Sequence, residues 1–447
     1  MKKWLSVSMT LVFLISILAA CSGNTNTNGN TATNAAAGEN SGKKNESDAK
    51  PVELNLSIWG DENRKKLYED LMAKYTETHP NVKVDVMLIP FNDYQQKLSI
   101  MSASKSGPDL VWLSERMVPQ FLDSGQLLDI SSLEADAEYD LKDIYPTTMD
   151  LFRKDSKLYG VSFTSGPKVL FFNKDMFKAK GLKTPLELAK EGKWTYEEFV
   201  KSAKTLTDSS KGVYGVHLFG ANNSWKSWTD GLVDTFWAHG ADVFNEDGSK
   251  FVLNSPEGEQ ALKLYYDLLF TDKSHVDPGN QLTFESGNIG MYRNNFSFSN
   301  NARKITNFDW DIAPMPKGPA ADAPSAVGIA GYAIMKDTAH PEETLELLKY
   351  LTGKQGSTDL AKSFAPIRKS ILESDVFLNI DPKPSVEAIK AAYIGPLNSG
   401  VRPQPLHQNW QQIDVKVQTL MDLMYTKTET PKQVLERMEK EVSPLLK

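Results

Sequence analysis

The 447-residue sequence contains a single cysteine, Cys21, so the chain can form no internal disulfide and no metal site built from cysteines. Its six histidines lie far apart, without the i, i+4 spacing of a helical zinc pair, and we expect no bound metal. The chain also lacks an excess of positive charge. Its 57 acidic and 50 basic residues give a formal charge of −7, whereas proteins that bind nucleic acid need a basic surface. We therefore expect neither a metalloprotein nor a nucleic-acid-binding protein.

The N-terminal apolar segment is shorter than the ~20 residues that a membrane-spanning helix needs. Residues 5–18 follow two lysines and lead to Leu18–Ala19–Ala20–Cys21, which places small residues before the cysteine. This order is typical of a secretory signal peptide, here residues 1–20. It also resembles a bacterial lipobox, which implies that Cys21 is lipidated and becomes the first residue of the mature chain. An idle cysteine in an ordinary signal peptide is the alternative.

Residues 22–50 contain no aromatic and no branched aliphatic side chain. Such a segment cannot bury enough apolar surface to offset the entropy of ordering it. We therefore predict that residues 21–50 consist of the lipidated Cys21 and a disordered linker. A linker of this kind allows the folded part to tilt while it stays at the membrane.

The remainder is longer than one hydrophobic core usually organises, and it alternates strand and helix patterns. Alternating elements indicate parallel α/β units, and their uneven spacing argues against a single barrel. The predicted strands are 54–59, 81–86, 109–113, 170–172, 213–216 and 289–292. The predicted helices are 61–78, 93–102, 195–206, 256–269, 341–351, 384–392 and 408–424.

Polar and aromatic residues follow several of these strands. In open parallel sheets, ligands bind beyond the carboxyl ends of the strands. Candidate ligand groups therefore include the residues from Trp59 to Glu62, those from Ser114 to Arg116, Ser165–Gly166, and those from Arg293 to Asn295. These positions predict a binding cleft without reference to any known protein.

Several motifs recur in a characteristic order along the folded part. They are Ser106-Gly-Pro-Asp-Leu-Val, Leu170-Phe-Phe-Asn-Lys-Asp-Met-Phe, Trp194-Thr-Tyr-Glu-Glu-Phe, Phe284-Glu-Ser-Gly-Asn-Ile-Gly-Met, Trp310-Asp-Ile-Ala-Pro-Met-Pro and Gly328-Ile-Ala-Gly-Tyr-Ala-Ile. Their order and spacing resemble the family 1 extracellular solute-binding proteins. The resemblance implies an α/β fold of two lobes joined by three hinge crossings, near Ser165, Ala313 and Pro366, with a ligand cleft between them. The implied N-terminal lobe comprises residues 51–165 and 314–365, and the C-terminal lobe comprises residues 166–313 and 366–447.

The same resemblance implies a function. The chain is expected to bind a sugar or oligosaccharide outside the cell and to deliver it to the permease subunits of an ABC importer. It is expected to be a monomer without a cofactor, held by its lipid at the outer face of the cytoplasmic membrane of a Gram-positive bacterium. A sensory lipoprotein is one alternative. A glycoside-active enzyme, with Asp61, Glu62 and Glu115 as candidate carboxylates, is the other.

Sugars combine apolar C–H faces with rims of hydroxyl groups, so their sites combine aromatic rings with planar polar groups. Three tryptophans lie within residues 225–237, and Asp61 could instead cap the following helix. Trp112 and Trp310 are expected to be core residues. The predicted ligand-binding residues are Trp59, Asp61, Glu62, Ser114, Glu115, Arg116, Trp228, Asp230, Trp237, Asn294, Asn295, Tyr332 and Trp410.

Overall fold

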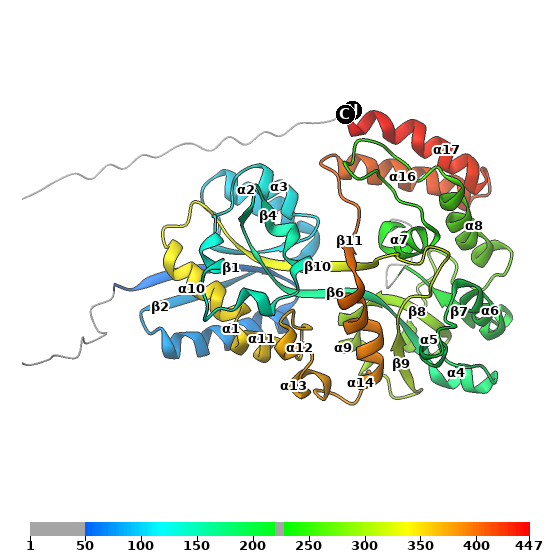
Figure 1. Cartoon of the computed structure of the whole chain (residues 1–447), viewed down its shortest axis with the longest axis horizontal. Helices are drawn as coiled ribbons and strands as arrows, with labels where there is room; N and C mark the ends of the chain where they lie inside the picture. The colour runs from blue at the N-terminus through cyan, green and yellow to red at the C-terminus, as the bar shows by residue number, and fades with distance from the viewer. Residues whose placement is uncertain (1–49, 220–227) are drawn as a thin grey trace, which may run out of the picture. The chain divides into compact units, whose positions relative to one another are not determined.

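The structure, a computed structural model, describes residues 50–219 and 228–447 (Figure 1). Residues 50–447 form one compact unit. The predicted signal peptide, Cys21 and the predicted linker up to residue 49 lie outside the described residues, and so does Trp225. No helix in the described ranges combines the length and the apolar character that a membrane crossing requires.

The first part of the described chain alternates strands and helices, as the sequence predicts. Strand β1 pairs in parallel with β2 on one side and β3 on the other. Helix α1 begins after Asp61, whose carboxylate accepts a hydrogen bond from the backbone N–H of Arg64 at 3.0 Å. The elements are β1 (Val52–Trp59), α1 (Glu62–Thr78), β2 (Val82–Ile89), α2 (Phe91–Ala103), β3 (Leu110–Ser114), α3 (Val118–Asp123), β4 (Arg153–Lys154) and β5 (Lys157–Leu158).

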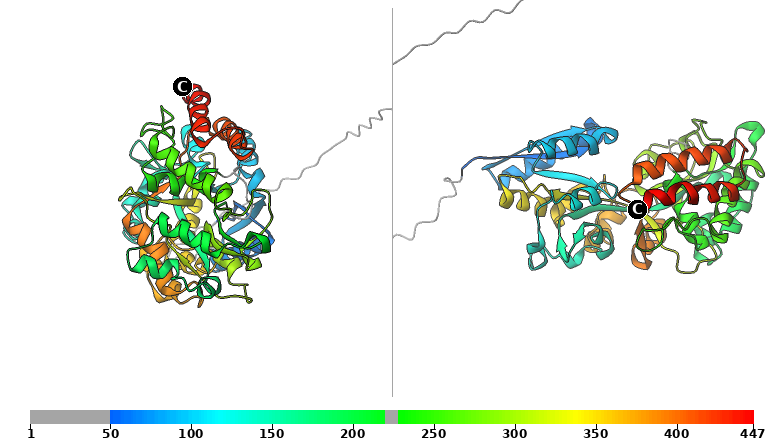
Figure 2. Two further views of the ribbon diagram at one scale, coloured as in Figure 1. Left: turned by 90° about the vertical axis from the view of Figure 1, so that its right-hand side faces the viewer. Right: turned by 90° about the horizontal axis from the view of Figure 1, so that it is seen from above.

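A second group of strands is built around β6 (Val161–Asn173). Strand β6 pairs antiparallel with β8 and β9, and β7 adds to β8 in parallel. The C-terminal helices α16 and α17 lie side by side, as Figure 2 shows in orange and red. The elements of this part are α4 (Lys174–Ala179), α5 (Pro185–Lys190), α6 (Tyr196–Leu206), β7 (Tyr214–His217), α7 (Trp228–His239), α8 (Pro256–Phe270), β8 (Ile289–Asn295), α9 (Ser299–Ala302), β9 (Trp310–Ala313), α14 (Val386–Ile389), α15 (Gly395–Ser399), α16 (Trp410–Tyr425) and α17 (Pro431–Val442).

Two strands connect these groups. The sheet order is β2-β1-β3-β10-β6-β8-β7, with β11 (Val401–Pro403) paired to β10 (Ser325–Ile334) and β9 paired to β6. Strand β10 pairs with both β3 and the first half of β6, whereas the second half of β6 pairs with β8. Figure 1 shows β6 and β10 running between the two groups of elements.

The buried apolar side chains form two large clusters, one on each side of this passage. One contains Trp112, Phe163 and Tyr332, and we call the elements around it lobe 1. The other contains Phe171 and Trp310, and we call the elements around it lobe 2. Helices α10 (Pro341–Thr352) and α11 (Lys354–Leu360) pack in lobe 1, and α12 (Lys369–Leu372) and α13 (Asp375–Leu378) in lobe 2. This arrangement is the predicted two-lobed α/β fold.

The chain passes between the lobes along three segments. The first lies in β6, where Phe163 belongs to the first cluster and Val169 to the second. The second lies in β10, later than the position expected near Ala313, because the backbone N–H of Lys317 donates to the Trp194 carbonyl at 3.0 Å and keeps the intervening loop on lobe 2. The third lies within residues 360–367, where Leu360 and Ile367 belong to the first cluster and Ala361 and Ala365 to the second, and the position expected near Pro366 falls in this segment.

Candidate binding cavity between the two lobes

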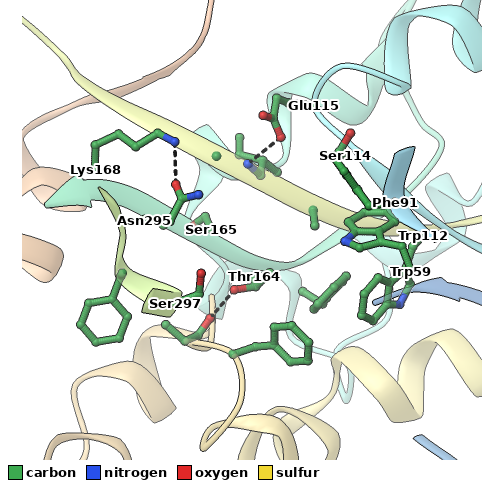
Figure 3. A pocket seen from close by; sticks show the side chains of 18 of the residues that line it. Trp59, Phe91, Trp112, Ser114, Glu115, Thr164, Ser165, Lys168, Asn295 and Ser297 are labelled. Atoms are coloured by element: carbon green, nitrogen blue, oxygen red, sulfur yellow. Dashed lines mark hydrogen bonds between the residues drawn. The ribbon is translucent and has the colours of Figure 1, made fainter. Parts of the chain in front are cut away.

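A cavity of about 650 Å³ opens where β6 and β10 pass between the lobes. Residues of both lobes line it (Figure 3). The lining residues are Trp59, Arg64, Phe91, Trp112, Ser114, Glu115, Arg116, Phe163, Thr164, Ser165, Gly166, Lys168, Asp230, Asn295, Phe296, Ser297, Gly328, Ile329, Ala330, Phe364, Ala365 and Tyr393.

Five aromatic residues form one wall of the cavity, which we call the aromatic wall: Trp59, Phe91, Trp112, Phe163 and Phe364. The Trp59 ring centre lies 4.8 Å from that of Trp112 and 5.6 Å from that of Phe91, edge to face in both cases. Phe163 continues the wall, 4.9 Å from Trp112 and 5.4 Å from Phe364. Phe91 remains 49% exposed, which is high for a phenylalanine in a soluble protein. The aromatic wall therefore offers apolar ring surface to a bound molecule.

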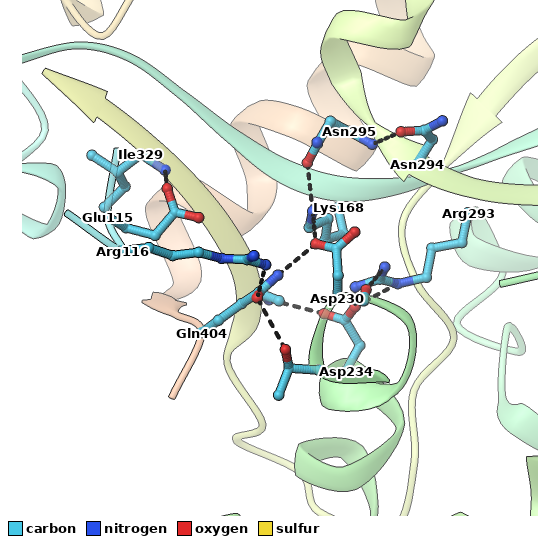
Figure 4. A network of polar contacts seen from close by, with 12 residues as sticks. Glu115, Arg116, Lys168, Asp230, Asp234, Arg293, Asn294, Asn295, Ile329 and Gln404 are labelled. Atoms are coloured by element: carbon cyan, nitrogen blue, oxygen red, sulfur yellow. Dashed lines mark hydrogen bonds and ion pairs between the residues drawn. The ribbon is translucent and has the colours of Figure 1, made fainter. Parts of the chain in front are cut away.

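Polar groups of lobe 2 lie at the other end of the cavity, as Figure 3 shows for Lys168 and Asn295. Lys168 is 4% exposed, forms an ion pair with Asp230, and donates from Nζ to Asn295 Oδ1 at 2.6 Å. Asp230 also accepts from Gln404 Nε2 at 2.5 Å (Figure 4). Burial alone raises the pKa of Asp230, but the positive charges of Lys168 and Arg293 outweigh it and hold that pKa far below its usual range. Asp230 is therefore a fixed negative charge.

Glu115 and Arg116 follow strand β3 and bring charge from lobe 1. Glu115 Oε2 accepts from the backbone N–H of Ile329 in β10 at 3.2 Å. Burial raises the pKa of Glu115, opposed by the positive charges of Arg116 and Lys168. Arg116 Nη2 donates to Gln404 Oε1 at 3.3 Å, a contact that connects lobe 1 to the polar groups of lobe 2 (Figure 4).

Two buried hydroxyl groups belong to the same lining. Ser114 is 7% exposed and Ser165 2% exposed, and among the described residues neither Oγ has a hydrogen-bond partner. An unpaired buried hydroxyl is costly, so these groups favour a bound molecule that hydrogen-bonds with them. The cavity thus combines ring faces with fixed donors and acceptors. Among the described residues, no group of three or more His, Cys, Asp or Glu side chains is arranged to hold a metal ion.

The structure brings part of the predicted site together. The predicted residues that line the cavity are Trp59, Ser114, Glu115, Arg116, Asp230 and Asn295. Asp61 instead caps α1, and Glu62 lies exposed in the first turn of that helix. Asn294 donates to the Tyr292 hydroxyl at 3.0 Å, away from the lining. Tyr332 is buried in lobe 1, where its hydroxyl lies 2.5 Å from that of Tyr68.

The three remaining predicted tryptophans lie outside the cavity lining because other groups of lobe 2 cover them. Trp228 is buried, donates from Nε1 to Asp414 Oδ1 at 2.9 Å and stacks on Trp410, with ring centres 5.9 Å apart. Trp237 donates to Asp242 at 3.1 Å, and the guanidinium of Arg402 lies 3.9 Å from its ring centre. Trp112, expected in the core, is fully buried and yet forms part of the aromatic wall.

Sequence reasoning missed several lining residues: Arg64, Phe91, Phe163, Thr164, Lys168, Ser297, Phe364 and Tyr393. Lys168 could have been identified from the sequence, because it directly precedes the apolar run of residues 169–172 and a lysine that is buried there needs a partner. Phe163 and Phe364 lie within two residues of predicted crossings, where residues of both lobes meet. The others carried no pattern that distinguishes them from ordinary surface or core residues.

Comparison with known proteins identifies similar proteins that bind solutes outside the cell. The family model for bacterial extracellular solute-binding proteins matches residues 59–358. The diacetylchitobiose-binding protein of Streptomyces coelicolor is 24% identical over 392 residues, which cover 84% of each chain. The ABC substrate-binding protein of Listeria monocytogenes in complex with cycloalternan has a TM-score of 0.76 at 22% identity, over 89% of this chain and 99% of that one. An ABC transporter solute-binding protein of Thermotoga lettingae, bound to tagatose, has a TM-score of 0.73 at 21% identity, over 89% of this chain and 100% of that one. The chain belongs to the family of bacterial extracellular solute-binding proteins.

Proposed function

We propose that this protein binds a carbohydrate in the cavity between its lobes and delivers it to the permease of an ABC importer. The observation that carries the proposal is the aromatic wall of lobe 1 facing the Lys168–Asp230–Asn295 group of lobe 2 across one cavity. The C–H face of a sugar ring packs on aromatic surface, while its hydroxyls pair with charged and amide groups. The cavity offers both kinds of group at once.

The relatives support this choice of ligand class. The similar proteins described above are named for, or were solved with, diacetylchitobiose, cycloalternan and tagatose. These ligands differ in size and in linkage, so they favour carbohydrate without favouring one sugar. Because the chain belongs to a family of binding proteins, it is a binding protein and not an enzyme.

Delivery requires that the bound state differ from the free state. A ligand that contacts both lobes favours the conformation in which the lobes are close, and it shifts the population toward that conformation. Residues on either side of the β6 and β10 passage line the cavity, and this supports a ligand position in which both lobes are contacted. A permease can then distinguish the loaded protein from the empty one.

We also propose where in the cell the protein acts. The signal peptide and the Leu18–Ala19–Ala20–Cys21 segment support export, followed by lipidation of Cys21 at the outer face of the cytoplasmic membrane of a Gram-positive bacterium. We propose that the protein acts there as a monomer. Labelling with radioactive palmitate tests the anchor, and the label should be absent from Cys21→Ser.

A thermal-shift screen against saccharides tests the binding function. Residues 50–447 contain both cores and serve as the sample. A saccharide present at 100 times its dissociation constant stabilises the native state by about 2.7 kcal/mol and raises the melting temperature. Amino acids and dipeptides serve as control ligands. Shifts produced only by the control ligands, or a saccharide recovered in cleaved form by mass spectrometry, would contradict the proposal.

A further inference from the structure

The charges that line the cavity do not balance. Three cationic side chains, Arg64, Arg116 and Lys168, face two carboxylates, Glu115 and Asp230. Lys168 is paired with Asp230. In the part of the chain that the structure describes, no ion pair joins Arg64 or Arg116 to a carboxylate. The cavity therefore carries surplus positive charge on lobe 1.

Arg64 is the better placed of these two arginines to receive an anion. Its guanidinium lies over the aromatic wall, 5.1 Å from the ring centre of Phe364 and 5.8 Å from that of Trp112. Its one hydrogen bond to the described residues is a long contact of 3.4 Å from Nη1 to the Trp59 carbonyl. By contrast, Arg116 is exposed and donates to Gln404. Cation–π contacts with these two rings position the donor fork of Arg64, and most of its donors have no hydrogen-bond partner among the described residues.

The local backbone is arranged around the Arg64 side chain. Gly60 has φ of +139°, and a Cβ atom there would lie 2.8 Å from Arg64 Cδ. Glycine at this position therefore leaves room for the arginine to turn toward the cavity. Asp61, three residues before Arg64, accepts from the Arg64 backbone N–H at 3.0 Å as the cap of α1, and among the described residues it forms no ion pair with the guanidinium.

On the basis of the proposed carbohydrate function, we propose that the ligand is an acidic saccharide and that Arg64 binds its carboxylate. The planar guanidinium matches a carboxylate with two parallel hydrogen bonds, and it does so better than it matches single hydroxyl groups. A uronic acid unit also supplies the negative charge that a partly buried, unpaired guanidinium needs. The rest of its ring packs against the aromatic wall, as in any sugar site.

Matched saccharide pairs test the charge preference. Digalacturonate is compared with galactobiose, and glucuronic-acid-substituted xylobiose with xylobiose, by calorimetry on residues 50–447. We expect at least one acidic member to bind about 10–100-fold more tightly than its neutral counterpart, which is the range for hydrogen bonds to charged groups. Arg64→Gln should remove most of that ratio, and Arg64→Lys should retain part of it because it keeps the charge without the planar fork.

The ratio of acidic to neutral affinity separates ligand binding from a structural role, because simple loosening of the aromatic wall weakens both members of a pair alike. Arg437→Gln is the matched control. It removes the same charge from an exposed position of helix α17, where Arg437 pairs with Glu429 and Glu441, and it should leave the ratio unchanged. Neutral members that bind as tightly as the acidic ones, or an undiminished ratio in Arg64→Gln, would overturn the inference and leave the carbohydrate function standing. A panel in which no saccharide of either kind binds would overturn both.

Discussion

Replacement of Trp59 by alanine should weaken saccharide binding without unfolding the protein. Trp59 is half-buried at the end of β1, where its ring contacts Phe91 and Trp112 and lines the cavity. A sugar ring stacked on an indole removes about 60–80 Å² of apolar surface from water, which corresponds to about 1.5–2 kcal/mol at about 25 cal/mol per Å². The dissociation constant should therefore rise about 10–30-fold.

Calorimetry with the saccharide that gives the largest thermal shift measures this change, and Trp410→Ala is its matched control. Trp410 is also a half-buried tryptophan with an aromatic neighbour, but it stacks on Trp228 and lies outside the cavity lining. Its truncation should leave affinity unchanged. Urea unfolding of both unliganded variants separates a binding defect from lost stability. An unchanged dissociation constant for Trp59→Ala would refute the assignment of the aromatic wall to ligand binding, as would an equal loss in Trp410→Ala.

Three further changes test other parts of the structure. Asp234→Ala leaves the buried Arg293 guanidinium without its carboxylate and should cost about 3–5 kcal/mol of unfolding free energy in urea titrations; a loss below about 1 kcal/mol would contradict the buried pair. Gly60→Ala introduces strain at positive φ and displaces Arg64, so it should cost about 1–3 kcal/mol by the same measurement and reduce affinity as well. Because burial raises the pKa of Glu115, its contribution to stability is fully present below the unfolded pKa of about 4.3 and is lost as pH rises through the raised folded value. At pH values above the folded pKa of Glu115, Glu115→Gln should therefore have a higher free energy of unfolding than the parent, and below about pH 4.3 it should not. A difference in unfolding free energy that does not change with pH would contradict this reasoning.

The elements with a clear local pattern could be predicted from the sequence. Strand β1 and helix α1 have alternating and helical apolar spacing, and their positions are confirmed within a few residues. Strand β10 was not predicted as a strand, because Gly328 and Gly331 interrupt its apolar residues and its partner strands β3, β6 and β11 come from distant parts of the chain. Strand β6 was predicted only over residues 170–172, since its first half carries Ser165–Gly166–Pro167, a typical breaker sequence. Tertiary pairing determines both strands.

The binding site, like the fold, could be predicted from the sequence only in part. The expectation that ligands bind beyond the carboxyl ends of parallel strands identified Ser114, Glu115 and Asn295. It succeeded because it depends on the direction of the strands and not on side-chain packing. Aromatic clustering was a poor guide, since Trp228 and Trp410 stack on each other within lobe 2. No sequence pattern distinguishes a tryptophan that faces a cavity from one that faces a helix.

The position of Lys168 connects ligand contacts with movement of the lobes. Along β6, Pro167 is the last residue paired with β10, and Lys168 is the first paired with β8. The residue at which the strand changes partner is therefore the one that holds Asp230 and Asn295 in the cavity. A ligand shifts the conformational equilibrium only through contacts that differ between the two states. The aromatic wall and the groups held by Lys168 lie on opposite sides of this change of partner. The binding free energy of a ligand that contacts both therefore depends on any rotation of one lobe relative to the other at Lys168. Ligands that reach only one side would bind without closing the lobes.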